Sequence, residues 1–504
     1  MCFALFRKSI LLMTMVVGVS IGMPLWAQSP DGTITIDAGA PSRPFPHFWE
    51  KMFGSGRAIL TLRDSWRRDA REVKQITGFQ YVRFHAILHD EVGVYDEDQS
   101  GKAVYNFSYV DQIYDGLLAM GAKPFVEISF IPKKLASKPD LFPFWYQPSV
   151  APPTDYAKWD ALVTALCQHL IERYGIDEVA TWYFEVWNEP NIDFWGGDPK
   201  QPTYFELYDH TAKAVKAANS KLRIGGPSTA QAAWVGDMIA HAVKNNVPLD
   251  FVSTHVYGND TADNVFKTNE VIPRSQMVCR AVKKVHDEIT SSTRPDMPLF
   301  WSEYNAAYDN TVEVTDSIYM GPFMANTISQ CDGMATAMSY WSLSDVFEEQ
   351  GVVKTPFYGG FGLIAAGNIP KPAFYAFEIL HDLGDQRLAS SDPNVLVTKA
   401  KDGSLVVAVW NLVNPGETGA AKTVQLDFKG VKSGARLSIA RVDDKHGNTL
   451  ALWDKMGKPR YPTQAQISQL RQESKLPPPG QQKLNGGKIT LQLPVNGLAV
   501  LTVK

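Results

Sequence analysis

The chain has 504 residues, of which 45% are hydrophobic and 20% are charged, and its formal net charge is −4 at pH 7. These fractions are typical of a soluble globular protein with a sizeable core. The length allows one large domain with a smaller one, or two to four ordinary domains. A mildly acidic chain without a basic tract lacks the electrostatic pattern of a nucleic-acid-binding protein.

The first 27 residues have the layout of a secretory signal peptide. Arg7 and Lys8 precede the apolar run SILLMTMVVGVSIGM, and PLWAQS follows with Ala27 at the expected cleavage point. The run is about 15 residues long and a membrane span needs roughly 20, so an uncleaved anchor is the alternative. We therefore expect a secreted or periplasmic protein without a later membrane span. Loss of Arg7 and Lys8 would change its net charge from −4 to −6.

The four cysteines do not have the number and spacing of a disulfide framework. Cys2 lies in the predicted signal peptide, and Cys167, Cys279 and Cys331 are widely spaced in apolar helical contexts. An odd number of remaining cysteines does not indicate a set of disulfides, and no C-x-x-C pair indicates a metal site. The sequence therefore predicts three buried free thiols.

From about residue 48 to 345, short β-rich runs alternate with amphipathic helical stretches. The eight runs are FWEKMFGSG, YVRFHAIL, KPFVEISF, WYFEVWNEP, RIGGPS, FVSTHVYG, LFWSEYN and ATAMSYWSLSD. Such alternation indicates parallel strands joined by right-handed crossovers, and eight units over roughly 300 residues fit an α/β fold of the (β/α)₈ TIM-barrel type. An open doubly wound sheet is the alternative, but FGSGR lacks the G-x-G-x-x-G spacing of a phosphate-binding turn.

A different pattern begins after about residue 392. Six strand runs separated by turn signals predict a C-terminal antiparallel β-sandwich: NVLVTKA, SLVVAVWNL, KTVQLDF, ARLSIARVD, KITLQL and LAVLTVK. The expected domains are an N-terminal strand at 28–43 that joins the sandwich, the barrel at 44–385 and the accessory sandwich at 386–504. We expect the sandwich to brace the barrel rather than to bind a ligand.

Two glutamates end predicted barrel strands. Glu189 closes the fourth run and Glu303 lies near the end of the seventh, where side chains of such a barrel face its mouth. Paired carboxylates suit the cleavage of a glycosidic bond, in which one is a protonated acid and the other attacks the anomeric carbon or activates water. Two charges about 5 Å apart repel by about 3 kcal/mol at an effective dielectric near 20, roughly two pKa units, so one glutamate can stay protonated.

The neighbours of the two glutamates favour one assignment of roles. Asn188 can hydrogen-bond a sugar 2-hydroxyl beside Glu189, and Pro190 ends the strand there. Tyr257 on the sixth strand could donate a hydrogen bond to a charged Glu303. We assign Glu189 as the acid/base and Glu303 as the nucleophile, although these residues alone leave the reverse open. An inverting hydrolase, with carboxyl groups roughly 6.5 to 9.5 Å apart, and a non-catalytic carbohydrate-binding protein also remain as alternatives.

The segments around these positions resemble glycoside hydrolase family 39, the family of the β-xylosidases and α-L-iduronidases. The matching segments, within about residues 44–385, are WNEPN followed by FW, THVYG, WSEYNAAY, SYWSLSDVFEE and GGFGLI…IPKPAFYAF. The resemblance implies a retaining mechanism with a covalent intermediate, Glu189 as acid/base, Glu303 as nucleophile, and no metal or organic cofactor. It also implies a subsite for the non-reducing sugar that is lined by Asn188, His85, His255, Tyr257, Trp341, Glu348 and Glu349, with the last two holding distal hydroxyls. WSEYN departs from the Thr/Glu/Phe-like surround expected in the family, which puts contacts beside the nucleophile in doubt.

The expected activity is that of an exo-acting β-D-xylosidase that releases xylose from the non-reducing end of xylo-oligosaccharides. The nearest rival, α-L-iduronidase, acts on a sugar with a carboxylate, so its pocket would need a cation where this sequence offers Glu348 and Glu349. Arabinosidase, galactosidase and glucosidase activities are harder to separate, because one hydroxymethyl group is worth only a few kcal/mol. The expected partner is a small glycoside, with no nucleic acid and no membrane, and the sequence leaves the oligomeric state open.

Overall fold

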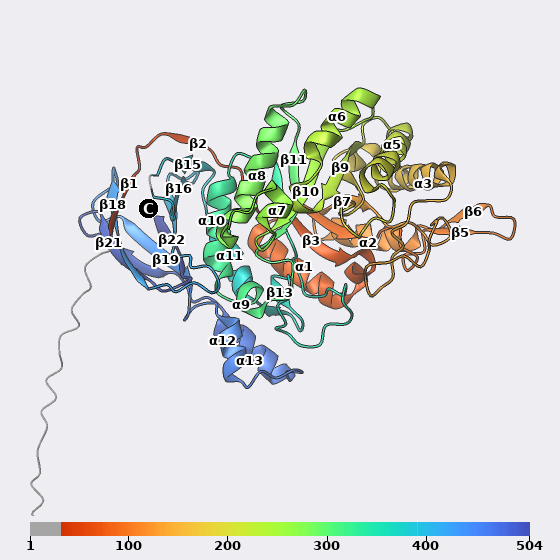
Figure 1. The fold of residues 1–504 in the computed structure, drawn as a ribbon. Coiled ribbons are helices and arrows are strands. Elements are labelled where there is room, and N and C mark those ends of the chain that lie inside the picture. The colour runs from red at the N-terminus through yellow and green to blue at the C-terminus, as the bar shows by residue number, and fades with distance from the viewer. Residues whose placement is uncertain (1–31, 391) are drawn as a thin grey trace, which may run out of the picture.

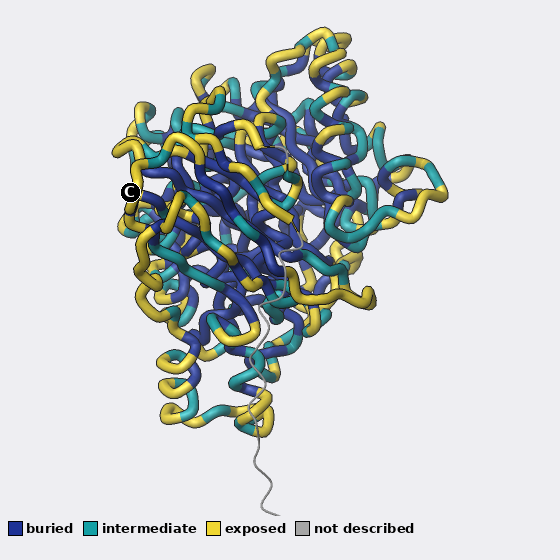
Figure 2. The backbone as a smooth tube through the Cα atoms, turned by 90° about the vertical axis from the view of Figure 1, so that its left-hand side faces the viewer, coloured by how far each residue is buried: buried dark blue, intermediate teal, exposed yellow. Residues whose placement is uncertain are grey.

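The computed structural model describes residues 32–390 and 392–504, so the predicted signal peptide lies outside the described residues. Figure 1 shows a barrel surrounded by helices beside a smaller β-rich body that contains the C-terminus. Buried residues fill the interior of the molecule, and exposed residues gather on its outer turns (Figure 2).

Eight parallel strands close into a barrel in chain order, with the eighth paired to the first. They are β3 (Met52–Arg57), β4 (Tyr81–His85), β7 (Lys123–Ile128), β8 (Tyr183–Val186), β9 (Arg223–Thr229), β10 (Phe251–Tyr257), β11 (Leu299–Asn305) and β12 (Ala337–Tyr340). Each overlaps one of the eight predicted runs. The predicted (β/α)₈ barrel is therefore confirmed, and the open doubly wound sheet is excluded.

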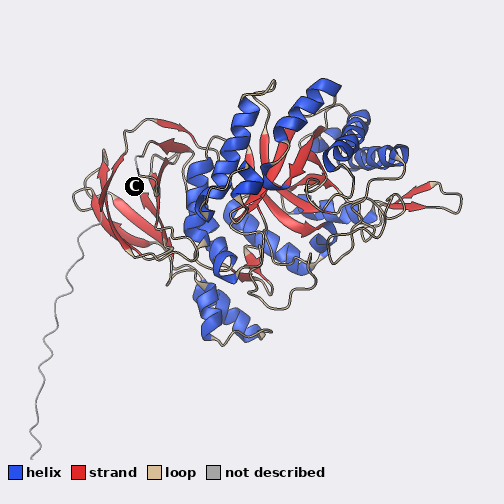
Figure 3. Cartoon of the chain, in the orientation of Figure 1, coloured by secondary structure: helices blue, strands red, loops and turns tan. Residues whose placement is uncertain are grey.

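Helices surround the barrel strands (Figure 3). The longer ones are α1 (Asp64–Thr77), α2 (Ser108–Ala119), α3 (Tyr156–Tyr174), α5 (Lys200–Ala218), α6 (Val235–Asn245), α8 (Arg274–Thr290), α10 (Met320–Cys331) and α11 (Pro372–Leu380). The short ones are η1 (Ala58–Leu62), α4 (Ile176–Val179), η2 (Ala230–Ala232), α7 (Ala262–Phe266) and α9 (Val312–Thr315), and two small hairpins are formed by β5 (Tyr95–Glu97) with β6 (Ala103–Tyr105) and by β13 (Ile364–Ala365) with β14 (Ile369–Pro370). Helix α1 illustrates the pattern, because Trp66, Ala70 and Val73 share its buried face and Gly78 ends it in the left-handed region. No helix that the structure describes is long and apolar enough to cross a bilayer.

The interior of the barrel is apolar at one end and charged at the other. Met52, Phe125, Phe251 and Phe300 come from the first halves of their strands and form one buried cluster. The second halves carry buried charged and polar residues, among them Arg83, His85, Glu127, Glu185, His255 and Glu303. The apolar plug closes the N-terminal end, so the chemistry of the barrel is confined to the C-terminal mouth.

The C-terminal body is a two-sheet sandwich. The larger sheet has the order β2 (Ser42–Pro44), β15 (Gln386–Leu388), β16 (Val395–Lys399), β17 (Leu405–Trp410), β22 (Leu498–Val503), β19 (Arg436–Val442) and β20 (Gly480–Lys483), and the smaller sheet has β1 (Gly32–Asp37), β18 (Lys422–Lys429) and β21 (Lys488–Leu493). Ile36, Val407, Leu426 and Leu501 belong to the apolar cluster of these two sheets. The pairing is antiparallel throughout except that β1 runs parallel to β18.

Two helices of the C-terminal region were not predicted. They are α12 (Thr449–Lys455) and α13 (Gln464–Ser474), which lie between β19 and β20 in the chain. Trp453 and Leu470 pack against Phe357 from the loop after β12, and Arg471 is ion-paired with Glu72 of α1 at 3.1 Å. The pair of helices therefore joins the sandwich to the barrel. The sequence does contain a helix-start signal for α13, because the segment TQAQ forms a capping box at its N-terminus.

The prediction of three free thiols is wrong for two of the cysteines. Cys279 of α8 and Cys331 of α10 form a disulfide, with their Cα atoms 5.2 Å apart, whereas Cys167 is free and buried. The two cysteines are 52 residues apart. Their pairing depends on α8 and α10 being neighbours around the barrel, which spacing in the sequence does not show.

Candidate active site

A cavity of about 350 Å³ opens at the C-terminal ends of the barrel strands. Of the predicted site residues, it is lined by His85, Asn188, Glu189, Tyr257, Glu303, Trp341 and Glu349. It is also lined by seven residues that were not predicted, namely Ile192, Phe194, Ala230, Gln231, Asp260, Tyr308 and Phe361. The structure therefore brings together side chains from most of the barrel strands.

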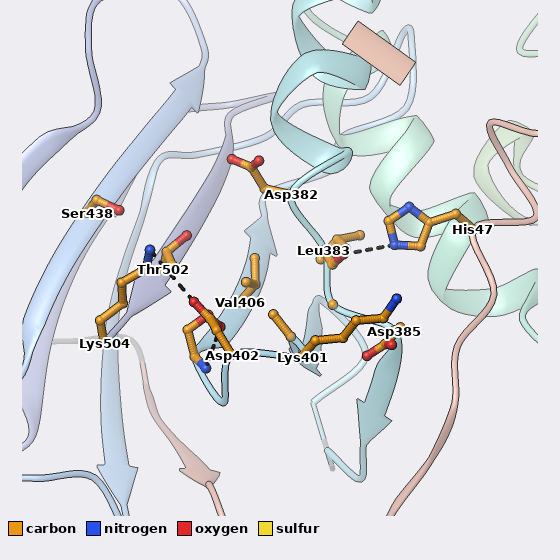
Figure 4. A pocket seen from close by; sticks show the side chains of 13 residues that line it. His47, Asp382, Leu383, Asp385, Lys401, Asp402, Val406, Ser438, Thr502 and Lys504 are labelled. Carbon is orange, nitrogen blue, oxygen red and sulfur yellow. Dashed lines mark hydrogen bonds and ion pairs between the residues drawn. The ribbon is translucent and has the colours of Figure 1, made fainter. Parts of the chain in front are cut away.

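A larger hollow of about 710 Å³ lies between the last barrel helix and the sandwich (Figure 4). Three carboxylates line it, and one of them, Asp402, accepts hydrogen bonds from Ser404 and lies 3.9 Å from the Lys504 ammonium. These contacts lower the pKa of Asp402, and burial raises the pKa of Asp382. This hollow, however, lies away from the C-terminal ends of the barrel strands, where barrels of this kind carry their catalytic residues. We therefore place the chemistry at the barrel mouth.

Glu303, on β11, accepts hydrogen bonds on both of its carboxylate oxygens. Its Oε1 accepts a hydrogen bond from Arg83 Nη1 at 2.7 Å, and its Oε2 accepts one from the Tyr257 hydroxyl at 2.5 Å. Burial raises the pKa of Glu303, but Arg83, His85 and the Tyr257 hydroxyl oppose that rise. Two charge-assisted hydrogen bonds thus stabilise the carboxylate form. The bond from Tyr257 is the one that the sequence predicted.

Arg83 links the carboxylates beneath the cavity. It is fully buried on β4 and lies 2.5 Å from Glu185 Oε2 and 2.7 Å from Glu127 Oε2. Its Nη2 also donates to Asn188 Oδ1 at 3.0 Å. Asn188 therefore has its oxygen occupied by Arg83 and its amide nitrogen left as the donor for a ligand in the cavity.

A chain of hydrogen bonds places a proton on Glu189. Ser302 Oγ donates its proton to Glu185 Oε1 at 2.7 Å. The lone pairs of Ser302 Oγ can therefore accept a hydrogen bond from His255 Nε2, which lies 3.0 Å from it. His255 Nδ1 then carries a lone pair and lies 3.0 Å from Glu189 Oε1. Burial and the nearby Arg83 charge lower the pKa of His255, which keeps the imidazole neutral. The proton shared between His255 and Glu189 must therefore come from the Glu189 carboxyl.

The two glutamates are close together and lie in different electrostatic surroundings. Burial raises the pKa of Glu189 well above its ordinary value, and the charges of Glu303 and Asp260 raise it further. One carboxylate oxygen of Glu189 and one of Glu303 lie within 4.8 Å of each other. This closeness fits the about 5 to 5.5 Å that separates the two carboxyl groups of a retaining glycosidase.

The backbone that carries Glu189 adopts the left-handed conformation. Trp187, Glu189 and Ser228 have φ values of 74°, 49° and 53°, although none of them is glycine. This conformation costs a non-glycine residue about 1 to 3 kcal/mol of folding free energy, and it persists where the surrounding structure fixes it. The Glu189 amide donates to Ser228 O at 2.7 Å, which joins the ends of β8 and β9. This hydrogen bond fixes the backbone turn that directs the Glu189 carboxyl group into the cavity.

His85 and Glu349 form the wall beside Glu303. His85 Nδ1 lies 2.7 Å from Glu127 Oε2, and its Nε2 lies 3.6 Å from Glu349 Oε1. Burial acts to lower the pKa of His85, but the charges of Glu127 and Glu303 outweigh it and raise the pKa. Burial raises the pKa of Glu349 to about 7, although His85 opposes this. This wall can donate and accept hydrogen bonds, as recognition of sugar hydroxyls requires.

Trp341 packs against the glycine of the first barrel strand. A Cβ on Gly54 would lie 2.1 Å from the Trp341 ring. The FGSG segment therefore contains glycine because the indole approaches its backbone, not because it binds phosphate. Trp341 and Phe361 belong to one aromatic cluster that lines the cavity, and such faces can pack against the apolar face of a sugar ring.

Two predicted residues, Glu348 and His255, lie behind the cavity wall. The Glu348 carboxylate is ion-paired with Arg63 at 2.6 Å and with Arg57 at 3.1 Å. Burial acts to raise the pKa of Glu348, but the two arginines outweigh it and lower the pKa. Of the two neighbouring glutamates, the structure therefore places Glu349 at the cavity. His255 is likewise fully buried and acts on a ligand through Glu189.

Sequence reasoning missed the charged residues beneath the site. Arg83, Glu127 and Glu185 lie inside the runs YVRFH, FVEIS and YFEVW. A charge within an otherwise buried strand is unusual, so this signal could have identified all three. Gln231, Asp260 and Tyr308 lie beyond the strand ends, where the sequence shows no comparable pattern.

Two groups of described residues have donor atoms close enough to surround a metal ion. In the group Glu189, His255 and Glu303, the ligand atoms lie within 4.8 Å of one another, but the hydrogen bonds described above already satisfy them. The other group, His47, Glu50 and His381, lies outside the cavity, where Glu50 contacts both imidazoles. That the site needs no metal or organic cofactor remains a prediction.

Comparison with known proteins agrees with this geometry. A family profile described as "Glycosyl hydrolases family 39" matches residues 32–481. A β-xylosidase of Geobacillus stearothermophilus is 39% identical over 84% of this chain and 86% of its own, and one of Caldicellulosiruptor saccharolyticus is 36% identical over 88% and 91%. The solved structure of a monomeric β-xylosidase from Caulobacter crescentus CB15 is similar with a TM-score of 0.85 and 32% identity, covering 94% of this chain and 99% of that one.

Proposed function

The chain belongs to glycosyl hydrolase family 39, and we propose that it is a retaining exo-β-xylosidase that releases xylose from the non-reducing end of xylo-oligosaccharides. The observation that carries this proposal is the pair of carboxyl groups with oxygens within 4.8 Å of each other, that of Glu189 hydrogen-bonded to His255 and that of Glu303 hydrogen-bonded to Arg83. The likeness to two β-xylosidases over more than four fifths of both chains supports the substrate class.

In the first step, a Glu303 carboxylate oxygen attacks the anomeric carbon as the bond to the leaving oxygen breaks. Glu189 gives its proton to that oxygen, so the leaving group departs as a neutral hydroxyl. The products are a glycosyl ester on Glu303 and a Glu189 carboxylate. The Asn188 amide nitrogen is the donor available to the 2-hydroxyl, and this contact strengthens in the transition state.

In the second step, the Glu189 carboxylate removes a proton from a water molecule. The oxygen of that water attacks the anomeric carbon, and the bond to Glu303 breaks. Glu303 returns as a carboxylate and Glu189 as an acid. Two inversions at the same carbon leave the β configuration unchanged.

The charges around the cavity disfavour the iduronidase alternative. A sugar carboxylate needs a cationic partner, yet the residues that line the cavity include neither lysine nor arginine. They do include four carboxyl groups, those of Glu189, Asp260, Glu303 and Glu349. An anionic sugar would therefore meet repulsion from several directions.

A panel of aryl glycosides tests the proposed activity. The xyloside should be hydrolysed with the highest kcat/KM. The arabinoside, galactoside and glucoside, whose sugars differ from xylose by an added hydroxymethyl group or by the orientation of a group, should follow. The iduronide should be the poorest, because its carboxylate would enter an acidic cavity. Fastest release from the iduronide or from a hexoside would replace xylose as the substrate. If no glycoside is turned over, the carbohydrate-binding alternative is favoured instead.

We also propose that the protein is exported as a soluble enzyme without a nucleic-acid or membrane partner. The disulfide between Cys279 and Cys331 supports export, because such bonds persist in oxidising compartments. Cleavage after Ala27 would give a mature chain that begins at Gln28. Mass spectrometry of the protein recovered from periplasm or medium should find this terminus, and an intact Met1 terminus would contradict the proposal.

A further inference from the structure

The cavity has two sides, which belong to the two glutamates. On the side of Glu303, His85 Nε2 lies 3.8 Å from Glu303 Oε1 and 3.6 Å from Glu349 Oε1. On the other side, the loop that follows Glu189 is tied to η2, the short helix after β9. Asn191 Nδ2 donates to Ala230 O at 3.0 Å, and the Ala230 amide donates to Asn191 Oδ1 at 2.8 Å.

Gln231 follows this tie and lines the cavity in a strained conformation. Its φ is 62° and its ψ is 30°, a left-handed conformation that glutamine rarely adopts. Ala232 and Trp234, in the same turn, also have positive φ values of 53° and 60°. A turn of this kind in a cavity wall indicates that the position of the Gln231 side chain is fixed at a cost.

Asp260 lines the same side of the cavity from the end of β10. Its Oδ2 accepts a hydrogen bond from the Tyr257 amide at 2.7 Å, which fixes the turn. Burial raises the pKa of Asp260 to about 6, although the Tyr257 amide and the Gln231 side chain oppose this. Among the described residues, no cation is ion-paired with it. A carboxyl group so placed, and facing a cavity, is suited to hydrogen-bonding the hydroxyls of a ligand.

We propose that Asp260 and Gln231 bind the hydroxyl groups of the leaving xylose unit and so set the preference of this enzyme for oligosaccharide over simple aglycones. In a retaining enzyme the acid lies beside the departing oxygen, and Gln231 and Asp260 lie on the Glu189 side. Tyr308, which is 54% exposed and lines the cavity, offers its ring to the same unit. This inference rests on the proposed function.

The position of Asp260 gives it a second effect, on the acid itself. Its charge raises the pKa of Glu189, so the ionised form of Asp260 helps Glu189 to keep its proton. Removing that charge should move the alkaline limb of the kcat/KM profile to lower pH. A merely structural role in the turn would leave the limb unmoved.

The test compares xylobiose with 2,4-dinitrophenyl β-xyloside in Asp260→Asn. The asparagine keeps an oxygen for the Tyr257 amide, so the turn should persist. For xylobiose, kcat/KM should fall by about tenfold to a hundredfold, as expected for lost hydrogen bonds to a charged group. For the aryl xyloside, whose leaving group has no sugar hydroxyls, it should change less than about threefold. Gln231→Ala should act in the same direction with a smaller loss.

Asp263→Asn is the matched control, because Asp263 is exposed on α7 and does not line the cavity. It should leave both substrates unchanged. Equal losses on both substrates in folded Asp260→Asn would overturn the proposal and assign Asp260 to the general geometry of the site. No loss on either substrate would also overturn it. The wild-type rates report separately on the proposed function, since an absence of turnover there would refute the activity itself.

Discussion

Replacing Glu303 with glycine should lower kcat on 2,4-dinitrophenyl β-xyloside by a factor on the order of 10⁵, as expected when a covalent nucleophile is removed. No other carboxylate can take its place, because Glu189 is protonated through His255 and Glu349 is displaced toward His85. The barrel should stay folded, since Arg83 keeps its ion pairs with Glu185 and Glu127. Steady-state kinetics with circular dichroism would measure both effects.

Azide provides the control for this variant. A small anion can occupy the space of the missing side chain and attack the anomeric carbon once, so the product should be the α-xylosyl azide. Glu303→Gln keeps the volume of the side chain, leaves no such space and should not be rescued. Formation of the β azide, or full activity without azide, would show that Glu303 is not the nucleophile.

The alternation of the sequence was sufficient to predict the barrel and the position of both glutamates. Each strand carries a buried β-rich run, and a parallel barrel brings all eight C-terminal ends to one mouth. Glu189 and Glu303 could therefore be placed together although they are far apart in the chain. Tyr257, two residues after His255, shares a strand face with it, which explains why both belong to the site.

The remaining features depend on contacts that the sequence does not show. The disulfide requires α8 and α10 to be adjacent, and α12 and α13 interrupt a region whose pattern is otherwise that of strands. Glu348 and Glu349 are neighbours in the chain, yet ion pairs with Arg57 and Arg63 hold only the first behind the wall. Gln231, in η2, and Asp260, in the loop after β10, reach the cavity from segments whose conformations are set by tertiary contacts rather than by local propensity.

Replacing Glu189 with alanine should produce losses that depend on the leaving group. Xylobiose needs a proton on its departing oxygen, so kcat/KM should fall by about 10³ to 10⁴, the upper range for general acid catalysis. Dinitrophenolate leaves without a proton, so the first step on that substrate should be nearly unchanged, while the second step slows and KM falls. Added azide should restore turnover and give the β-xylosyl azide, because it attacks the Glu303 ester from the side of the missing acid.

The pH profile on xylobiose separates the two glutamates, because kcat/KM of the wild type on this substrate requires Glu303 charged and Glu189 protonated. It should fall as the pH drops through the pKa of Glu303 and as it rises through the pKa of Glu189. Since burial and Glu303 raise the pKa of Glu189, the alkaline limb should lie well above the range of an ordinary glutamic acid. With Glu189→Ala, the residual turnover of xylobiose should no longer show that limb.

Ser302→Ala tests whether the proton on Glu189 depends on the chain through His255. Without the Ser302 oxygen, the Nε2–H of His255 loses its 3.0 Å acceptor, so the tautomer with a proton on Nδ1 becomes more favourable. That proton would point at Glu189 and favour its carboxylate, so the alkaline limb should move to lower pH with little change on the dinitrophenyl substrate near the optimum. Ser253→Ala is the matched control, because its buried hydroxyl has no hydrogen-bond partner among the described residues. An unmoved limb in Ser302→Ala would mean that Glu189 stays protonated without Ser302, either through burial and the Glu303 charge or because the Ser228 hydroxyl, 3.4 Å from His255 Nε2, holds the same tautomer.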